Sequence, residues 1–466
     1  MSNNKKGENE KTEKVERADR KPNWREVYAT VDDIRQFLSE NALLRHNTVT
    51  GRVEGHVIDE DPWEELVEQA REGNATEEAL MAAAAEDERQ RRRQAEDCWM
   101  PLTERDENTL WARLSRQKPV RKQDMHNVIH SDFVPDYNPF QAYLDALPPW
   151  NGTDDYIMEL SLTVSVQGGT DEQLRFYEYL KKWLVAMVAG WVTPTVVNNV
   201  MLVLIGKQGA YKTTWFSYLL PPELKAYFYT KTDASRMTKD DLLVLAHYAL
   251  VCYEELDTMT ARDLNNLKSA MTMMSIDERA AYERYHEHRP HIASFCGTGN
   301  STQFLSDATG NRRWLPFEVE SITSPREQPF NHRGIYAQAY RLLRDGYQYW
   351  FSAQEVASLT EHNRQYETPR LEEELVAMYF RRPVGQEPGE FMPVALAMQI
   401  VGSNITQKLS TVNLGRAFKT LGFQQRKSDS VRGYLVVRRS DQEMRSLRNQ
   451  LGMSIGTDGT DSTDNI

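Results

Sequence analysis

The sequence has few of the features of secreted, membrane-spanning or disulfide-bonded proteins. Only three cysteines, Cys98, Cys252 and Cys296, occur among its 466 residues, at wide and irregular spacing. This spacing gives neither a disulfide framework nor a zinc-binding pattern, and it suits a reducing compartment. The apolar runs fall well short of the ~18 residues that a membrane span needs, and the first residues are hydrophilic. We therefore expect a soluble cytoplasmic protein with no membrane partner.

The chain also lacks the positive charge of a protein that coats nucleic acid. It has 56 Lys and Arg against 68 Asp and Glu, a net charge of −12. Any binding to DNA must therefore come from local basic patches. At the usual ~100–200 residues per domain, a chain of this length is expected to hold about two to four domains.

Residues 200–214, VMLVLIGKQGAYKTT, have the pattern of a phosphate loop. An apolar run that suits a buried strand breaks into a glycine-containing turn that ends in Lys-Thr-Thr. In such a loop, backbone N–H groups face a phosphate, a lysine reaches the β- and γ-phosphates, and a hydroxyl binds Mg²⁺. Lys212 and Thr213 suit the last two roles. The residues expected to bind ATP are Gly206, Gly209, Ala210, Tyr211, Lys212, Thr213 and Thr214.

Tyr211 departs from the general pattern G-x-x-x-x-G-K-[ST], because it replaces the glycine before the lysine. A tyrosine there must either adopt ordinary helical geometry or hold a costly positive φ. The other interpretation of residues 200–214 is a strand, a turn and a helix with a coincidental Lys-Thr pair.

A second apolar strand is expected at residues 247–253, and it ends in Glu254 and Glu255. In a nucleotide site, the first of two such acids can hold Mg²⁺ through water and the second can orient the attacking water. Glu254 and Thr213 are thus the candidate metal-binding residues. Taken alone, two acids that end a strand indicate a solvated edge, since charged residues usually stay in water.

A third apolar strand, beginning at residue 291, runs into Gly-Thr-Gly-Asn and places Asn300 at its end. An asparagine there can hydrogen-bond the γ-phosphate and the attacking water, although alone it is an ordinary turn residue. Farther along, Arg312 and Arg313 precede another apolar run. Arginines in such a position can neutralise transition-state charge on a neighbouring subunit's nucleotide. The alternative for them is a surface ion pair.

Together these motifs resemble the virulence-associated protein E family, whose members are similar to superfamily 3 helicases of the AAA+ class from phages and mobile elements. The resemblance covers about residues 43–54 and 99–316 and rests on the order of the motifs. It implies Lys212 and Thr213 on nucleotide and Mg²⁺, an acidic pair, a sensor asparagine, and an arginine that acts in trans in a ring. The residues that it assigns to catalysis are Glu254, Glu255, Asn300, Arg312 and Arg313.

The interval 277–291 is rich in Arg, Tyr and His. In superfamily 3 helicases it contributes a hairpin to the central pore, where cations follow the phosphates of single-stranded DNA. The candidates for contact with DNA are Arg279, Arg284 and Tyr285, with Tyr282 as a second stacking group. The alternatives are a solvated charged turn and a metal site formed by His286, His288 and His291.

Helices followed by a basic hairpin are expected beyond residue 355, a pattern that suggests a winged helix. Such a module binds either DNA or another protein, and its basic residues favour DNA. The DNA bound there is expected to be duplex. The candidates for contact with its phosphates are Arg416, Lys419, Arg426, Lys427 and Arg438.

The fold expected is α/β, with a P-loop ATPase core of the AAA+ or superfamily 3 helicase type, a mixed N-terminal region and a C-terminal winged-helix-like domain. The expected segments are a disordered tail (1–22), a helical and hairpin region (23–150) with a charged helical insertion near 60–97, the ATPase domain (151–350), the winged-helix-like domain (355–442) and a second tail (451–466). Within them, amphipathic helices are expected at residues 23–41 and 172–191 and a β-hairpin at residues 43–57.

The function expected is ATP-dependent translocation on or unwinding of DNA by a homo-oligomer, a hexameric ring, in replication of a mobile element or phage. The first alternative is an ATP-binding switch or DNA-tethered scaffold that does not unwind DNA productively. The second is a phosphotransferase that uses the same loop. Asn300 and the two arginines favour the ring ATPase over the phosphotransferase.

Overall fold

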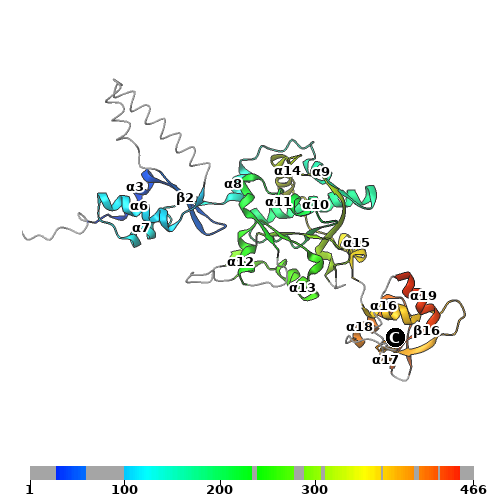
Figure 1. The fold of residues 1–466 in the computed structure, drawn as a ribbon. Helices are drawn as coiled ribbons and strands as arrows, with labels where there is room; N and C mark the ends of the chain where they lie inside the picture. Colours follow the sequence, from blue (N-terminus) through cyan, green and yellow to red (C-terminus); the bar gives the residue numbers. More distant parts are fainter. Residues whose placement is uncertain are drawn as a thin grey trace, which may run out of the picture.

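The computed structural model describes residues 28–58, 99–232, 239–277, 288–305, 310–368, 371–402, 409–428 and 431–451. They form three units along the chain, each with a core of its own (Figure 1). The predictions for the two tails, the insertion near 60–97 and the pore residues Arg279, Tyr282, Arg284, Tyr285 and His286 fall outside these ranges. None of the described helices combines the length and apolar character that crossing a lipid bilayer requires.

The N-terminal unit packs three helices against a small sheet of strand order β3-β2-β1-β4. β1 and β2 pair in antiparallel fashion, which confirms the hairpin expected after residue 43. Within the described residues, the helix expected at 23–41 begins at Val31, where the Thr30 hydroxyl and the Asp33 carboxylate form a capping box. The elements are α3 (Val31–Asn41), β1 (Ala42–Asn47), β2 (Arg52–Val57), β3 (Met100–Pro101), α6 (Glu104–Gln117), α7 (Lys122–Ile129) and β4 (Asp136–Tyr137).

The central unit is built on a six-stranded sheet of order β5-β12-β6-β11-β8-β7. β5 is antiparallel to β12, and the other five strands are parallel to one another. The strands are β5 (Val164–Val166), β6 (Met201–Ile205), β7 (Phe228–Lys231), β8 (Leu250–Tyr253), β11 (Ser294–Gly299) and β12 (Trp314–Ile322). A separate antiparallel pair joins β9 (Ser275–Ile276) and β10 (Arg289–Pro290).

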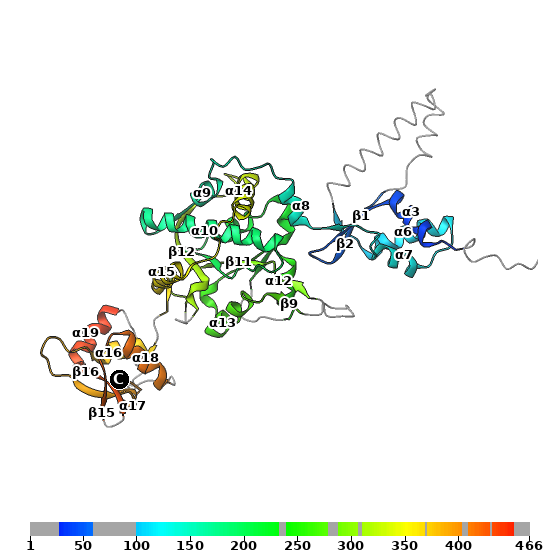
Figure 2. The same ribbon diagram turned by 180° about the vertical axis from the view of Figure 1, so that it is seen from behind.

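Helices cover both faces of this sheet (Figure 2). Leu202 and Leu204 of β6 belong to the core cluster that includes α10 and α14, whereas Met201, Val203 and Ile205 belong to the cluster that includes α13. A strand buried on both faces reads as an unbroken apolar run, as β6 does. The helices are α8 (Pro139–Asp145), α9 (Tyr156–Ser161), α10 (Gly169–Val192), α11 (Lys212–Ser217), α12 (Lys239–His247), α13 (Ala261–Ala270), α14 (His332–Arg344) and α15 (Ala353–Asn363), with short 3-10 turns η1 (Pro222–Tyr227), η2 (Leu256–Thr258), η3 (Asn311–Arg313) and η4 (Arg364–Tyr366).

The helix expected from residue 172 to residue 191 is present as α10, but its second half is not amphipathic. Every residue from Lys182 to Trp191 is buried. α10 contacts α9, α14 and the sheet strands β5 and β6, so its second half has no solvent-facing side. A helix that is apolar all round is a buried helix.

A buried asparagine joins the N-terminal hairpin to the central unit. The Asn47 side chain has no exposed surface, and its Nδ2 donates to Glu54 Oε1 at 2.6 Å and to Tyr227 Oη at 2.7 Å. Its Oδ1 accepts from the backbone N–H groups of Val49 and Thr50 at 3.0 and 3.1 Å, which forms the turn of the hairpin. The Asn47 amide therefore has hydrogen-bond partners for both its donor and its acceptor, and it also provides an acceptor for the backbone N–H groups of the turn.

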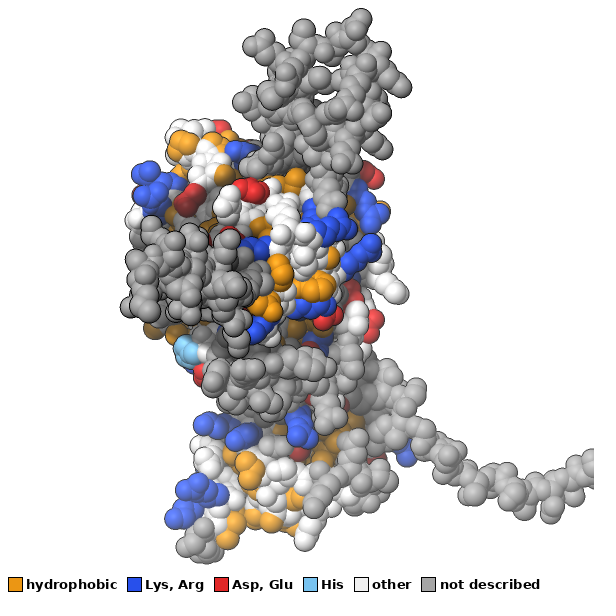
Figure 3. Space-filling model, turned by 90° about the vertical axis from the view of Figure 1, so that its left-hand side faces the viewer, with side chains coloured by type: hydrophobic (Ala, Val, Ile, Leu, Met, Phe, Trp, Pro, Cys, Tyr) orange, Lys and Arg blue, Asp and Glu red, His pale blue; other side chains and the backbone are white. Residues whose placement is uncertain are grey.

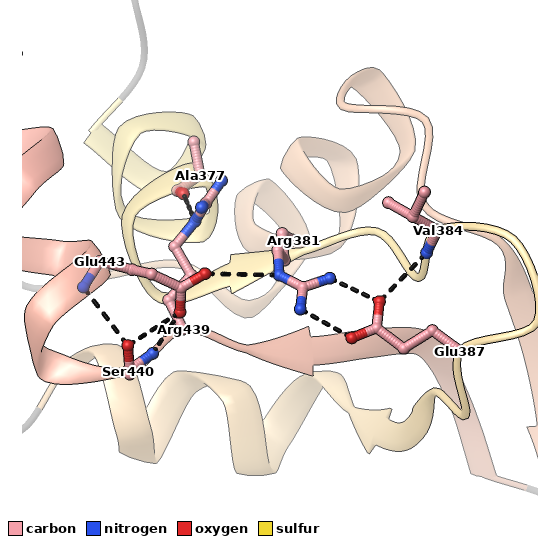
Figure 4. A network of polar contacts seen from close by, with 7 residues as sticks. All are labelled: Ala377, Arg381, Val384, Glu387, Arg439, Ser440 and Glu443. Carbon is pink, nitrogen blue, oxygen red and sulfur yellow. Dashed lines mark hydrogen bonds and ion pairs between the residues drawn. The ribbon is translucent and has the colours of Figure 1, made fainter.

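The C-terminal unit contains helices and a hairpin in the order that the sequence predicts. β16 lies between β14 and β15 and also pairs with β13. Ion pairs of Arg381 connect separate segments of this unit (Figure 4). Arg381 binds the Glu387 carboxylate through two hydrogen bonds, and its Nε lies 3.6 Å from Glu443 Oε1. The elements are α16 (Leu371–Tyr379), β13 (Phe380–Arg381), β14 (Glu390–Pro393), α17 (Val394–Gly402), α18 (Thr411–Thr420), β15 (Gln425–Ser428), β16 (Val431–Arg438) and α19 (Asp441–Leu451).

Replacement of Asn47 tests the junction. Asn47→Ala should destabilise the protein by about 2–3 kcal/mol, because it removes four hydrogen bonds and leaves the buried Tyr227 hydroxyl without its partner. Thermal unfolding followed by calorimetry measures this loss. Asn127→Ala, which removes an exposed amide from the same unit, is the matched control and should have little effect. Equal small effects for both variants would show that the junction does not depend on Asn47.

Candidate functional site

The carboxyl ends of three adjacent parallel strands meet at one edge of the central sheet. Gly299 of β11 pairs with Ile205 of β6, and Gly297 pairs with Tyr253 of β8. The residues that follow these strands are therefore neighbours in space although they lie far apart in the sequence. In open sheets of parallel strands, ligands bind outside the carboxyl ends. The loop at residues 206–211, the acids after β8 and Asn300 all lie at this edge.

Lys212 lies at the centre of the edge. Its side chain is buried, and Nζ donates to the backbone carbonyls of Gly206 at 2.6 Å and Lys207 at 2.8 Å. Nζ also lies 3.4 Å from Asn300 Oδ1. Burial lowers the pKa of Lys212, while the negative charge of Asp257 opposes this shift. The geometry thus holds an ammonium group between the loop and the end of β11.

Thr213 and Glu254 form a pair of oxygen donors beside Lys212. The Thr213 hydroxyl donates to Glu254 Oε1 at 2.9 Å, and both side chains are half-buried. A hydroxyl and a carboxylate are hard oxygen ligands of the kind that Mg²⁺ prefers, usually with several waters and substrate phosphates completing its shell. The donor set of these two residues therefore fits a magnesium ion that is shared with a phosphate.

Asp257 is a site residue that the sequence interpretation did not assign. Its Oδ1 accepts a hydrogen bond from the backbone N–H of Asn300 at 3.1 Å. The residue is placed by the turn η2, which begins directly after Glu255. Asp257 thus connects the end of β8 to the end of β11 and adds a negative charge near Lys212. A third acid close after Glu254 and Glu255 was the available sequence signal.

Two residues of this edge hold left-handed backbone geometry. Tyr211 has a φ of 57° and Glu255 a φ of 54°, and they are the non-glycine residues with positive φ in the described part of the chain. This conformation costs a side-chain-bearing residue roughly 1–2 kcal/mol. Such strain concentrates at functional sites, where the surrounding structure holds it in place. Tyr211 thus takes the costly alternative of the two that the sequence allows.

The loop around Lys212 is closed by backbone contacts. Gly206 donates its N–H to Gly299 O at 3.1 Å, and a Cβ on Gly206 would lie 3.1 Å from Val319 O. Gly209 has a φ of 83°, and Ala210 donates its N–H to Lys207 O at 3.4 Å. Thr214 lies in the first turn of α11, half-buried. The loop residues predicted to bind nucleotide are therefore continuous in space.

Arg312 and Arg313 lie at the opposite edge of the sheet. Both are in η3, directly before β12, and Trp314, the first residue of β12, pairs with Met201, the first residue of β6. Four residues of strand, about 13 Å at ~3.3 Å per residue, separate this edge from the end of β6. Arg312 is exposed, whereas burial and the nearby Arg312 charge lower the pKa of the half-buried Arg313. Within one chain, the two arginines and the loop at residues 206–211 therefore lie at opposite ends of the parallel strands.

A buried polar network holds the turn that carries these arginines. Asn363 Nδ2 donates to the carbonyls of Asn311 at 2.7 Å and Trp314 at 2.9 Å, and Asn363 has no exposed surface. Asn311 Nδ2 in turn donates to Glu367 Oε1 at 2.6 Å. Asn363 and Glu367 come from α15 and the segment after it, so the end of the central unit fixes the backbone at Arg312 and Arg313.

The residues predicted to bind DNA differ in their surroundings. Arg438 binds the Glu390 carboxylate through two bonds at 2.8 and 3.0 Å, which compensates its charge. Arg416, Lys419, Arg426 and Lys427 are exposed, the first two on α18 and the others on β15. On the face drawn in Figure 3, Lys and Arg side chains are interspersed with acidic and apolar ones. On this face, basic residues therefore occur in local groups and do not form one broad basic surface.

Substitution at Tyr211 tests the left-handed geometry. Tyr211 is 47% exposed, so Tyr211→Gly removes little packing and relieves a positive φ, and it should preserve or raise the unfolding temperature. Tyr211→Val should be less stable than Tyr211→Gly by about 1–2 kcal/mol, because β-branched residues resist this conformation. The same two substitutions at Gln208, a loop residue without positive φ, should not favour glycine. Equal stability of the Gly and Val variants at both positions would contradict the assigned geometry.

Comparison with known proteins gives one family. Residues 150–368 match the family model described as the virulence-associated protein E-like domain. Similar solved structures include the apo structure of the NrS-1 C-terminal region, with 12% identity, a TM-score of 0.45, and coverage of 87% of this chain and 98% of that chain. Its A form has 12% identity, a TM-score of 0.43 and the same coverage. No curated protein matches the sequence.

The matched residues run from just before α9 to just after η4, so they hold the loop around Lys212, the acids, Asn300 and both arginines. Residues 150–368 of this chain are therefore a virulence-associated protein E-like domain.

Proposed function

We propose that the central unit binds and hydrolyses Mg·ATP and that the protein uses this reaction to move along or unwind DNA. The observation that carries the proposal is the convergence of Lys212, the Thr213–Glu254 pair and Asn300 at the ends of three adjacent strands. A buried cation, two hard oxygen donors and an amide within a few ångströms match the needs of a triphosphate and its magnesium ion. The family supports a role in replication of a mobile element or phage.

Each residue has a defined task in this proposal. Lys212 exchanges its bonds to the Gly206 and Lys207 carbonyls for the β- and γ-phosphate oxygens. Thr213 and Glu254 hold Mg²⁺, which neutralises phosphate charge when it is bound. Glu255 is exposed and orients the attacking water, and Asn300 donates to the γ-phosphate. Asp257 positions Asn300 through the backbone hydrogen bond at 3.1 Å.

The arginines act between subunits. Arg312 and Arg313 lie at the sheet edge opposite the loop. They are therefore too far away to contact a nucleotide bound at Lys212 of the same chain. A neighbouring subunit whose loop faces this edge can receive either arginine. This arrangement requires a homo-oligomer, and a hexameric ring is the form we propose.

The C-terminal unit is proposed to bind DNA as a winged helix. Its elements are a helix, two short strands, two helices, two paired strands and a final helix, an order that includes the helices followed by a hairpin expected of such a module. Arg416 and Lys419 on α18, with Arg426 and Lys427 on the hairpin, supply exposed positive charge for phosphates. The second candidate function is an ATP-binding switch without productive unwinding, which the strained Tyr211 favours. Strand displacement separates the two candidates.

The hydrolysis step is tested with substitutions at Lys212 and Glu255. Lys212→Ala should abolish ATP turnover, with and without single-stranded DNA, because it removes the buried ammonium group that the loop holds for the β- and γ-phosphates. Glu255→Gln should bind ATP and lose about 10²–10⁴-fold in turnover, because the amide cannot polarise water. Steady-state ATPase assays with circular dichroism as a folding control measure both. If Glu254→Gln, not Glu255→Gln, binds without turnover, the roles of the two acids are reversed, and a parent rate for Lys212→Ala would overturn the proposal.

Mixing two inactive variants tests the shared site. Lys212→Ala lacks a working loop, and Arg313→Ala or Arg312→Ala lacks the arginine, so a mixture should regain activity at interfaces that combine an intact loop with an intact arginine. Loss of such an arginine costs roughly 10³–10⁵ in rate, so even partial rescue is measurable. The parent's activity per subunit should also fall on dilution through the assembly range. Constant activity down to a demonstrated monomer, without rescue on mixing, would exclude the trans mechanism.

A further inference from the structure

A cluster of metal-ligating side chains lies in the N-terminal unit, away from the phosphate loop. It consists of Glu107 on α6 and of His126 and His130 on α7. His126 Nδ1 lies 3.0 Å from Glu107 Oε2, and His130 Nε2 lies 3.0 Å from Glu107 Oε1. The two imidazole rings are 4.2 Å apart between centroids. One carboxylate thus faces two imidazole nitrogens from a neighbouring helix.

The sequence spacing explains the arrangement. His126 and His130 are four residues apart on a helix, so both lie on the same face of α7. That face is turned towards α6, which contacts α7, and Glu107 lies in the first turns of α6. The three candidate ligand atoms lie within 4.8 Å of one another. A tetrahedral ion with ligand bonds of about 2.0–2.2 Å holds its ligand atoms about 3.3–3.6 Å apart, so small side-chain rotations would bring these three atoms to that spacing.

We propose that Glu107, His126 and His130 form a binding site for a divalent transition-metal ion such as Zn²⁺, which fastens α6 to α7. Two imidazoles and one carboxylate are a recurrent zinc ligand set, and the remaining coordination position is open to water. The histidine side chains are 50% and 43% exposed, so an ion can reach the cluster from solvent. The Glu107 side chain is only 22% exposed and supplies the fixed anion of the site.

Binding needs only a change of proton position. Without metal, each imidazole donates one N–H to the carboxylate. When the ion binds, those two nitrogens become ligands and a neutral histidine carries its proton on the other ring nitrogen. The hydrogen bonds from His130 and His126 lower the pKa of Glu107, so the carboxylate is ionised at neutral pH and needs no deprotonation.

The test uses the full chain, stripped of metal and titrated with Zn²⁺ against a chromophoric chelator. The parent should bind Zn²⁺ at this site, and His126→Ala and His130→Ala should each weaken it by at least about ten-fold, the scale set by loss of even a supporting group. His56→Ala, which removes an exposed histidine from the same unit, is the matched control and should bind as the parent does. Co²⁺ should give a visible d–d spectrum without thiolate charge-transfer absorption, which separates this site from the cysteines.

Stability distinguishes a metal site from a purely hydrogen-bonded cluster. Zn²⁺ should raise the unfolding temperature of the parent and of His56→Ala, and not that of His130→Ala. Glu107→Gln keeps the side-chain shape and one acceptor oxygen, so this variant should fold. It should bind Zn²⁺ more weakly than the parent, because the negative charge is lost. Unchanged Zn²⁺ affinity in all three cluster variants, or no Zn²⁺ binding by the folded parent at neutral pH, would overturn the proposal.

Discussion

The parallel register of β6, β11 and β8 is the constraint on which the candidate site depends. Because these strands share a direction and adjacent positions in the sheet, Gly206, Glu254 and Asn300 follow strand ends at the same edge. Both faces of the sheet are buried, so each strand keeps its register through side chains packed on two sides. A shift of one residue would turn the apolar side chains of a strand to the wrong layer and move its terminal polar residue. The packing of the core therefore fixes the positions of the polar residues at this edge of the sheet.

That core also holds two unfavourable backbone conformations. Tyr211 and Glu255 are both left-handed, and each directly precedes a short element, α11 after Tyr211 and the 3-10 turn η2 after Glu255. The loop at residues 206–211 is held at its start because the Gly206 N–H donates to the Gly299 carbonyl, and η2 is fixed because Leu256 is buried in the core. Packing thus places the loop and the acids before any ligand arrives, which lowers the cost of ordering them on binding.

Much of this was accessible from the sequence, because strands buried on both faces and glycine-containing loops leave local patterns. The hairpin after residue 43, the strands before Gly206 and Glu254, and the helices and hairpin of the C-terminal unit are confirmed. Asp257 was missed because its contact with Asn300 crosses from one strand to the next. Asn363 and Glu367 support the arginine turn from far along the chain, and no local pattern reveals that. The backbone of Tyr211 was undecided, since tyrosine alone does not fix the sign of φ.

The most direct measurement of the central claim is a crystal structure of the full chain with Mg²⁺ and a non-hydrolysable ATP analogue. The γ-phosphate should lie within hydrogen-bonding distance of Lys212 Nζ and Asn300, the magnesium ion should be bound to the Thr213 hydroxyl with Glu254 beside it, and an adjacent subunit should supply Arg312 or Arg313. A nucleotide bound elsewhere in the chain, or a triphosphate at the loop with no contact to Lys212 and Thr213, would contradict this claim.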